Sequence, residues 1–390
     1  MALLASGCAL LATPRLPAPG TASARWLERG HDRIVTTDVE LDDLTRGRTL
    51  SSRLWWPDGA TGPLPLVVQS HGFLSDRGGG ASLARALARR GYVVVAATSP
   101  GTTLLARGGA RVEDVTEQPG DVSFLIDRLL DERSDVPPHP PIDAARIAVM
   151  GHSLGGLTAT LAAFDPRRRD ARIGAAISIA GPLAMFEPRF FASAPVPLLM
   201  IAGSGDVIVD YRRNALATFG TVPDETVVLI AGASHTGFDD AASGLARLLD
   251  NPDTLACWVL ARTVDLDAAQ ARLDELGRED DGVAPGYRIA PPCRDPPPPV
   301  AMDSARQQLL TTLAVTAFLD GRFAIDPRTR AQALDYLTNG LVRENPEVSV
   351  LATPRAAASA PLPVAVDDRS AIAQPSPAAV GATTAKGLLR

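Results

Sequence analysis

The stretch Gly151-His152-Ser153-Leu154-Gly155-Gly156 has the pattern G-x-S-x-G and contains the most reactive arrangement in the sequence. It follows an apolar run, residues 146–150, and precedes a stretch with helical spacing, residues 157–164. At such a strand-to-helix turn a serine has a strained backbone and an exposed hydroxyl, and the glycines allow close backbone packing. We predict that Ser153 is a nucleophile; the alternative is a glycine-rich turn with a solvated serine.

A serine hydroxyl needs a base to attack near neutral pH, and the sequence has five histidines. His235 lies in the loop after the apolar run 226–230, which places it at the same sheet edge as Ser153. Of the other four, His31 precedes the sheet and His139 lies in a Pro-rich loop. The remaining two, His71 and His152, belong to the turn motifs themselves. We predict His235 as the general base, the alternative being a surface histidine.

A third residue should orient the imidazole and stabilise its cation. Asp206 follows the predicted strand 197–202 and lies between Ser153 and His235 in chain order. The competitor is Asp210, whose alternative role is a helix cap near Tyr211. Two further carboxylates follow the histidine closely, and we expect them to be solvated: Asp239 and Asp240.

An acyl-transfer reaction also needs N–H donors for a developing oxyanion. The backbone N–H of Leu154, next to the serine, is one candidate. The other is the N–H of Phe73, in the loop that follows the apolar run 64–70. For Phe73 the alternative is an aromatic side chain that lines a pocket.

The elements that must position these residues are short apolar runs separated by helical stretches. The predicted strands cover residues 64–70, 92–97, 146–150, 173–179, 196–202 and 226–230. The predicted helices cover residues 81–90, 119–132, 157–164, 254–276, 304–319 and 328–342. This alternation indicates an α/β fold with a mostly parallel sheet and helices on both faces.

Composition shifts divide the chain into parts. Residues 1–24 resemble an export segment followed by a linker, 25–345 form the α/β domain, and 346–390 are an Ala/Pro-rich tail expected to be disordered. Within the domain, residues 251–302 follow the histidine loop as an insertion that is either a lid or a remote decoration.

Composition also limits function. The chain has 390 residues and a net charge of −6, so it lacks the basic footprint of a nucleic-acid binder. Its His, Cys and acidic residues show no metal-ligand spacing, and no G-x-G-x-x-G follows a strand. We therefore expect no metal and no organic cofactor.

The N-terminus favours export, with a cytoplasmic protein as the alternative. Residues 1–12 are apolar but too few to span a bilayer, and they lack a positive leading region. Cys8 follows small residues, as in a lipoprotein signal, and lipidation there would attach the protein to a membrane; the alternative is a chance cysteine. Cys257 and Cys293 bracket the insertion, and an oxidising compartment would let them pair.

Taken in order, the segments H-G-F at 71–73, G-H-S-L-G-G at 151–156, G-S-G-D at 203–206 and G-A-S-H at 232–235 resemble the α/β-hydrolase superfamily. Residues 90–96 and 118–122 are similar to dienelactone-hydrolase-like and platelet-activating-factor-acetylhydrolase-like proteins, and the histidine loop to cutinase-like polyester hydrolases. Two features depart from these families. Dienelactone hydrolases proper use a cysteine nucleophile, and compact polyester hydrolases lack so long an insertion.

The resemblance implies a serine carboxylic-ester hydrolase with Ser153, Asp206 and His235 as its triad. It implies small to medium acyl esters as substrates, an acyl-enzyme intermediate and an oxyanion hole at Phe73 and Leu154. One alternative is a lipase or phospholipid acyl hydrolase with a lid. Another is a non-catalytic, envelope-anchored binding protein with the same fold. We expect a monomer.

Overall fold

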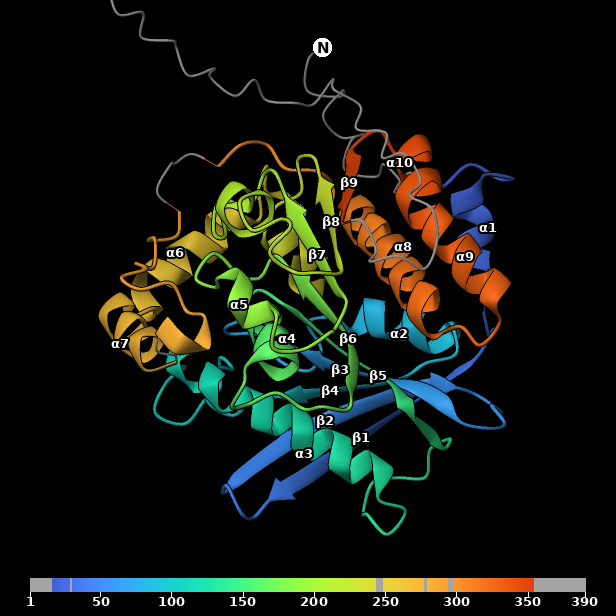
Figure 1. Cartoon of the computed structure of the whole chain (residues 1–390), viewed down its shortest axis with the longest axis horizontal. Helices are drawn as coiled ribbons and strands as arrows, with labels where there is room; N and C mark the ends of the chain where they lie inside the picture. Colours follow the sequence, from blue (N-terminus) through green and yellow to red (C-terminus); the bar gives the residue numbers. More distant parts are fainter. Residues whose placement is uncertain (1–15, 29, 243–247, 277–278, 294–297, 354–390) are drawn as a thin grey trace, which may run out of the picture.

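The computed structural model describes residues 16–28, 30–242, 248–276, 279–293 and 298–353. These residues form a nine-stranded sheet with helices on both faces (Figure 1), the predicted α/β architecture. The strands are β1 (Ile34–Asp43), β2 (Arg48–Pro57), β3 (Leu64–Ser70), β4 (Val93–Thr98), β5 (Ile142–His152), β6 (Ile173–Ile179), β7 (Leu198–Gly203), β8 (Glu225–Ile230) and β9 (Val348–Ala352). The helices are α1 (Ala22–Glu28), α2 (Ala81–Arg89), α3 (Gln118–Leu130), α4 (Leu154–Phe164), α5 (Pro188–Phe191), α6 (Asp253–Thr263), α7 (Leu266–Leu276), α8 (Ser304–Phe323), α9 (Pro327–Asp335) and α10 (Leu341–Glu344).

The strand order is β1-β2-β4-β3-β5-β6-β7-β8-β9. From β4 to β8 all neighbours are parallel, and the antiparallel pairs are β1 with β2, β2 with β4, and β8 with β9. Because β3, β5, β7 and β8 point the same way, the loops that follow them meet at one edge of the sheet. The predicted triad and oxyanion residues all lie in or next to these loops.

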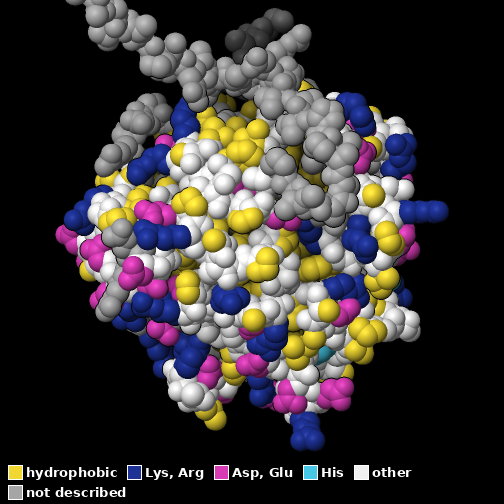
Figure 2. Space-filling view, viewed as in Figure 1, with side chains coloured by type: hydrophobic (Ala, Val, Ile, Leu, Met, Phe, Trp, Pro, Cys, Tyr) yellow, Lys and Arg dark blue, Asp and Glu magenta, His cyan; other side chains and the backbone are white. Residues whose placement is uncertain are grey.

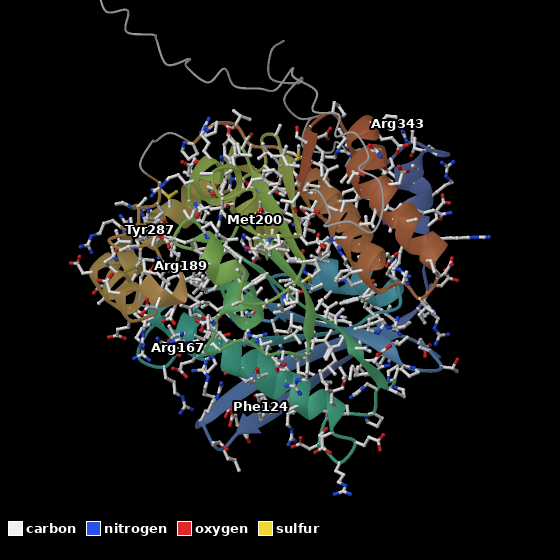
Figure 3. All side chains as sticks on the ribbon, in the orientation of Figure 1. Phe124, Arg167, Arg189, Met200, Tyr287 and Arg343 are labelled. Atoms are coloured by element: carbon white, nitrogen blue, oxygen red, sulfur yellow. A yellow bond between two sulfur atoms is a disulfide. The ribbon has the colours of Figure 1, made fainter. Side chains whose placement is uncertain are left out.

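Alternating side chains of the strands fill two separate cores. In β3, Leu66 and Val68 face the core that α3 and α4 cover, and Val67 faces the core that α2 and α8 cover. Met200 of β7, labelled in Figure 3, belongs to the first core. Strands buried on both faces explain why the parallel strands appear in the sequence as continuous apolar runs.

The first two strands form a hairpin that the sequence analysis did not predict. Its inward positions, including Leu41, Leu50 and Leu54, are completely buried, and its turn contains Gly47 at φ +63°. The outward positions are charged or hydroxylated, so the pattern alternates instead of forming an apolar run. Such alternation is the usual signature of a strand with one solvated face.

The α/β domain extends beyond its predicted limits, residues 25 and 345, at both ends. At the start, Ser23 and Ala24, assigned to the linker, are buried residues of α1, and Trp26 donates through its indole to Thr316 of α8 at 3.0 Å. At the other end, β9 pairs with β8 over five residues, although this segment was expected to be disordered. Pairing with the edge of β8 stabilises β9, a strand too short to be recognised from its own sequence. The tail from residue 354 onward lies outside the described residues.

Over residues 254–276, where one helix was predicted, the structure has two, α6 and α7. Val264 is extended (φ −90°, ψ 119°) and ends α6. The carboxylate of Asp265 then accepts the N–H groups of Asp267 and Ala268, both at 3.0 Å, which starts α7. In Figure 1 this helix pair lies on the opposite side of the molecule from α1, α9 and α10.

Acidic and basic side chains are interspersed on the face seen in Figure 2. None of the helices in the described ranges combines the length and apolar character needed to cross a bilayer.

Candidate active site

Ser153 lies in a sharp turn between the end of β5 and the start of α4, with φ 56° and ψ −121°. A side chain at either neighbouring glycine would disrupt this turn. A Cβ at Gly151 would lie 2.1 Å from the Gly155 oxygen, and a Cβ at Gly155 would lie 2.2 Å from the Ser70 oxygen. The glycines of the motif therefore allow β3 and α4 to pack directly against the strained serine.

Ser153, His235 and Asp206 form one hydrogen-bonded chain. The distance from Ser153 Oγ to His235 Nε2 is 2.8 Å, and that from His235 Nδ1 to Asp206 Oδ2 is also 2.8 Å. His235 and Asp206 are 5% and 7% exposed. The structure thus brings together the three residues that the sequence suggested as nucleophile, general base and orienting carboxylate, although they lie 82 and 29 positions apart along the chain.

Asp206 is held by the loop that follows β7. Its Oδ1 accepts the N–H groups of Ile208 at 2.8 Å and Val209 at 2.7 Å, leaving Oδ2 for the imidazole. The competitor Asp210 instead accepts the Arg212 N–H at 2.9 Å, close to its predicted capping role.

The charges around His235 favour its protonated form. Burial is the largest single effect and lowers the pKa of the imidazole, but Asp206, Asp253 and Asp239 together outweigh it and raise the pKa above its ordinary value, with Asp206 contributing most. The site therefore stabilises the imidazolium that His235 would form on taking a proton as a general base.

The two oxyanion candidates line the same cavity as Ser153. Within the described residues, neither Phe73 nor Leu154 donates its N–H in a loop, turn or cap hydrogen bond. The loop of Phe73 is fixed by His71, whose Nδ1 lies 2.7 Å from the Gly72 oxygen and whose Nε2 accepts the Ser99 N–H at 2.9 Å. The arrangement leaves both amides free to bind an oxygen.

Two contacts near the site were not predicted. The ring of His152 lies 4.8 Å from that of His235, and His152 Nε2 is 3.0 Å from the His235 oxygen.

Asp239, expected to be solvated, is 7% exposed and accepts the Ser75 hydroxyl at 3.0 Å. Burial raises the pKa of Asp239 to about 6. The expectation for Asp239 was wrong because a loop distant in the sequence covers it; its burial has no signal in the local pattern.

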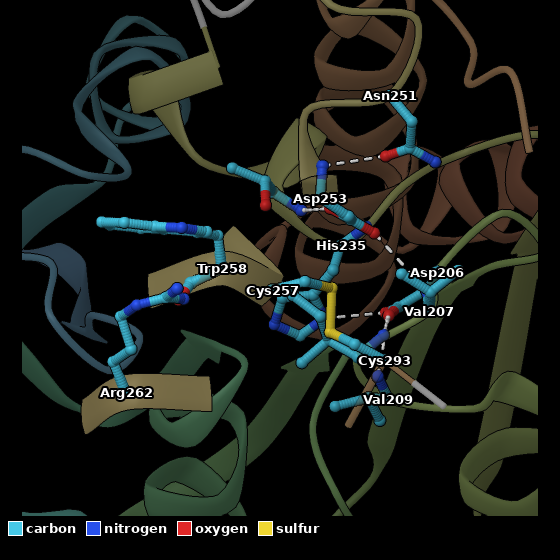
Figure 4. The surroundings of a disulfide bond; sticks show 12 residues. Asp206, Val207, Val209, His235, Asn251, Asp253, Cys257, Trp258, Arg262 and Cys293 are labelled. Atoms are coloured by element: carbon cyan, nitrogen blue, oxygen red, sulfur yellow. Dashed lines mark hydrogen bonds and ion pairs between the residues drawn. A yellow bond between two sulfur atoms is a disulfide. The ribbon is translucent and has the colours of Figure 1, made fainter. Parts of the chain in front are cut away.

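A cavity of about 930 Å³ opens above Ser153. One wall is formed by apolar residues of the insertion: Leu255, Val259, Leu260, Leu266, Leu273 and Ile289. A disulfide joins Cys257 of α6 to Cys293 (Figure 4). Cys293 lines the cavity, and Cys257 directly follows Ala256, which also lines it. Cys8 lies outside the described residues. Among the residues that the structure describes, no three His, Cys, Asp or Glu side chains are grouped as metal ligands.

Comparisons with known proteins find several hydrolases that are similar to this chain. The chain is 32% identical over 184 residues to 20-hydroxy-prefusarin hydrolase FUS2 of Gibberella moniliformis, and 31% identical over 186 residues to hydrolase LUC6 of a Fusarium species. In both cases the aligned part is 45% of this chain and 41% of the relative, so the chain spans about two fifths of these relatives. A solved ferulic acid esterase from Streptomyces cinnamoneus is 20% identical with a TM-score of 0.49, covering 80% of this chain and 94% of that one.

A family model described as "PETase: PET hydrolase-like" matches residues 12–268. The match includes Ser153, Asp206 and His235 and ends within α7. Polyester hydrolases are one of the groups that the histidine loop resembles. The chain therefore belongs to the PET hydrolase-like family of ester-hydrolysing α/β-hydrolases.

Proposed function

We propose that this protein is a serine carboxylic-ester hydrolase that works through Ser153, His235 and Asp206. The observation that carries the proposal is the continuous hydrogen-bonded chain from Ser153 Oγ through the imidazole to Asp206, with 2.8 Å at each step. The family match supports the same class of reaction.

In this mechanism, His235 Nε2 takes the proton of the Ser153 hydroxyl as the oxygen attacks the ester carbonyl. The N–H groups of Phe73 and Leu154 stabilise the tetrahedral oxyanion. His235 then protonates the leaving alkoxide, which gives an acyl-serine and a free alcohol. Water repeats the sequence and releases the acid. Asp206 stays ionised and holds the proton of the imidazole on Nδ1.

The cavity supports a small-molecule ester with an apolar part of small to medium length, because most of its exposed lining is apolar. A second candidate is a lipase or phospholipid acyl hydrolase. It is favoured by Leu255 of α6, which lines the cavity and is 56% exposed, and by Trp258 on the same helix, which is 57% exposed. Apolar side chains around a cavity mouth would adsorb to an aggregated lipid.

The deciding experiment is hydrolysis of nitrophenyl acyl esters of increasing chain length by the parent protein and by Ser153→Ala. Short-chain activity that disappears in the variant supports the esterase. A rate that rises when a long-chain ester passes its aggregation threshold supports the lipase. Labelling of Ser153 by a fluorophosphonate tests for an activated serine without a substrate, and a parent that is neither labelled nor active would indicate a non-catalytic binding protein.

We also propose that the protein acts outside the cytoplasm. The Cys257–Cys293 disulfide supports this, because such bonds persist mainly in oxidising compartments. Cell fractionation tests the proposal, and metabolic labelling with a fatty-acid analogue, compared with Cys8→Ala, tests lipidation at Cys8.

A further inference from the structure

The first residue of the insertion's first helix is a completely buried carboxylate. Asp253 begins α6, is 0% exposed and faces the two loops that carry His235 and Asp206. Its Oδ2 accepts the His235 N–H at 2.9 Å and the Val207 N–H at 3.4 Å, and its Oδ1 accepts the Thr236 N–H at 2.7 Å (Figure 4). One side chain therefore binds the backbone of both loops.

The same end of the insertion is fixed by three further bonds. Asn251 Oδ1 accepts the Asp253 N–H at 2.8 Å, and Asn251 Nδ2 donates to the Pro299 oxygen at 2.8 Å, which closes the base of the insertion. On the returning segment, the Cys293 N–H donates to the Val207 oxygen at 2.8 Å. The disulfide then joins that segment to α6 one turn after Asp253. Both backbone polar groups of Val207, next to Asp206, are thus bound by the insertion.

The two helices of the insertion contribute few buried residues. In α6 Asp253 is the one residue that is buried, and in α7 the buried hydrophobic residue is Leu273. The insertion is instead held at two places. One is its base, at the loops of His235 and Asp206, and the other is residues 282–284, where the Gly282 oxygen accepts the Glu187 N–H and the Ala284 N–H donates to the Met185 oxygen, both at 2.8 Å.

We propose that Asp253 is a positioning residue for the hydrolysis, which sets the relative placement of His235 and Asp206 and makes the insertion part of the active-site framework. The inference rests on the proposed function for its catalytic consequence. It adds a residue that does not touch the substrate. Asp253 acts through the backbone of His235 and of Val207, the residue after Asp206.

Position and charge act together at this site. The N–H bonds fix the backbone at His235 and Thr236, so the main chain that carries the imidazole cannot shift without breaking contacts to a buried carboxylate. The charged and titratable groups around His235 come from four places: Asp206 from the loop after β7, Asp253 from α6, Asp239 from the histidine's own loop and His152 from the turn before α4. Loss of the Asp253 charge therefore removes one anion that stabilises the imidazolium.

The main test is Asp253→Asn, which keeps the shape of the side chain but replaces one acceptor oxygen with a donor. Asp267→Asn is the matched control, because Asp267 is an exposed aspartate on α7 of the same insertion. We expect kcat for a short nitrophenyl ester to fall by about 10- to 100-fold in the first variant, with KM changed less, and to stay at the parental value in the control.

A second readout does not depend on turnover. The imidazole C–H resonance of His235, assigned by its absence in His235→Gln, is titrated by NMR in the parent and in both variants. We expect a lower pKa for His235 in Asp253→Asn only, because an anion next to it is lost. A residue that merely stabilised the fold would lower the melting temperature and leave this titration where it is in the parent.

The proposal is overturned if Asp253→Asn keeps both the parental kcat and the parental titration of His235, or loses activity with the titration unchanged. If that variant does not fold, Asp253→Glu decides, since it keeps the charge and displaces the carboxylate. If Asp253→Glu has a lower kcat but keeps the raised pKa of His235, the result supports a positioning role. A kcat equal to that of the parent contradicts it. A parent without esterase activity would refute the proposed function, while the titration would still decide the role of Asp253.

Discussion

The Nε2 atom of His152 lies 3.0 Å from the main-chain oxygen of His235, so the residue before the candidate nucleophile holds the loop of the candidate base. Loss of hydration lowers the pKa of His152 well below its ordinary value, with the nearby His235 acting in the same direction. His152 is therefore neutral at physiological pH and donates from Nε2.

His152→Phe keeps a ring at this position but removes the donor. A net hydrogen bond is worth about 0.5–1.5 kcal/mol, so we expect kcat/KM to fall by about 3- to 10-fold if that contact orients the base. Steady-state kinetics on a short ester measures this, with His31→Phe, an exposed position, as the control. Equal kinetics in the parent and both variants would show that the contact does not orient His235.

The pH dependence of kcat/KM should follow His235. The carboxylates around it, Asp206 foremost, together outweigh burial and raise the pKa of the imidazole, and a general base works only when it is unprotonated. Activity should therefore be constant at alkaline pH and fall tenfold per pH unit below a midpoint above 6.5. A pH–rate profile from pH 5 to 9 measures the midpoint, and one at or below the ordinary histidine value would contradict the arrangement.

Gly155 and Gly174 offer a matched pair for the close packing behind the serine. A Cβ at Gly155 would lie 2.2 Å from the Ser70 oxygen, whereas one at Gly174 meets nothing nearer than 3.5 Å. We expect Gly155→Ala to cost at least about 1–3 kcal/mol in the free energy of unfolding and to abolish activity, because β3 and α4 must separate. Gly174→Ala should remain active, and denaturant unfolding of both variants would reveal a result in the opposite order.

Glu225 should make stability depend on pH. Burial raises its pKa to about 7 from an ordinary 4.5, although the Gly220 N–H donates to its carboxylate at 2.8 Å. Between these values the folded chain binds a proton that the unfolded chain does not, so this group adds stability as the pH falls from 7 toward 4.5.

Glu225→Gln cannot titrate and should be more stable than the parent at pH 8, by about 2–4 °C in Tm for each kcal/mol. The difference should close by pH 5. Glu132→Gln, at an exposed position, is the control and should show a constant difference across the range. Thermal melts from pH 5 to 8 give the comparison, and a pH-independent gain for Glu225→Gln would rule out ionisation as its cause.

The placement of Ser153, Asp206 and His235 could be inferred from sequence because each directly follows a strand. Parallel strands end at one edge, so chain order and an apolar run are enough to bring distant residues together. The buried strands β3 to β8 were recognisable for the same reason.

Other features depend on contacts that no local pattern records. Asp253 reads as an ordinary acidic residue at the start of a helix, and its role is visible only when α6 packs on the loops of His235 and Asp206. The strand β9 is a five-residue run that forms because β8 offers an unpaired edge. The burial of Asp239 depends on Ser75, which precedes it by 164 positions.

The closure of the two ends of the domain has a consequence for the order in which the chain folds during synthesis. The first N–H groups of α1, at Ala22 and Ser23, are accepted by the carboxylate of Glu344, each at 2.7 Å, and Trp26 stacks on Tyr336. Glu344 follows Ala22 by 322 positions along the chain, so it leaves the ribosome much later. Until nearly the whole domain has been translated, α1 therefore keeps only the cap from the Thr21 hydroxyl, which accepts the Ala24 N–H at 3.1 Å, and its tryptophan stays unburied.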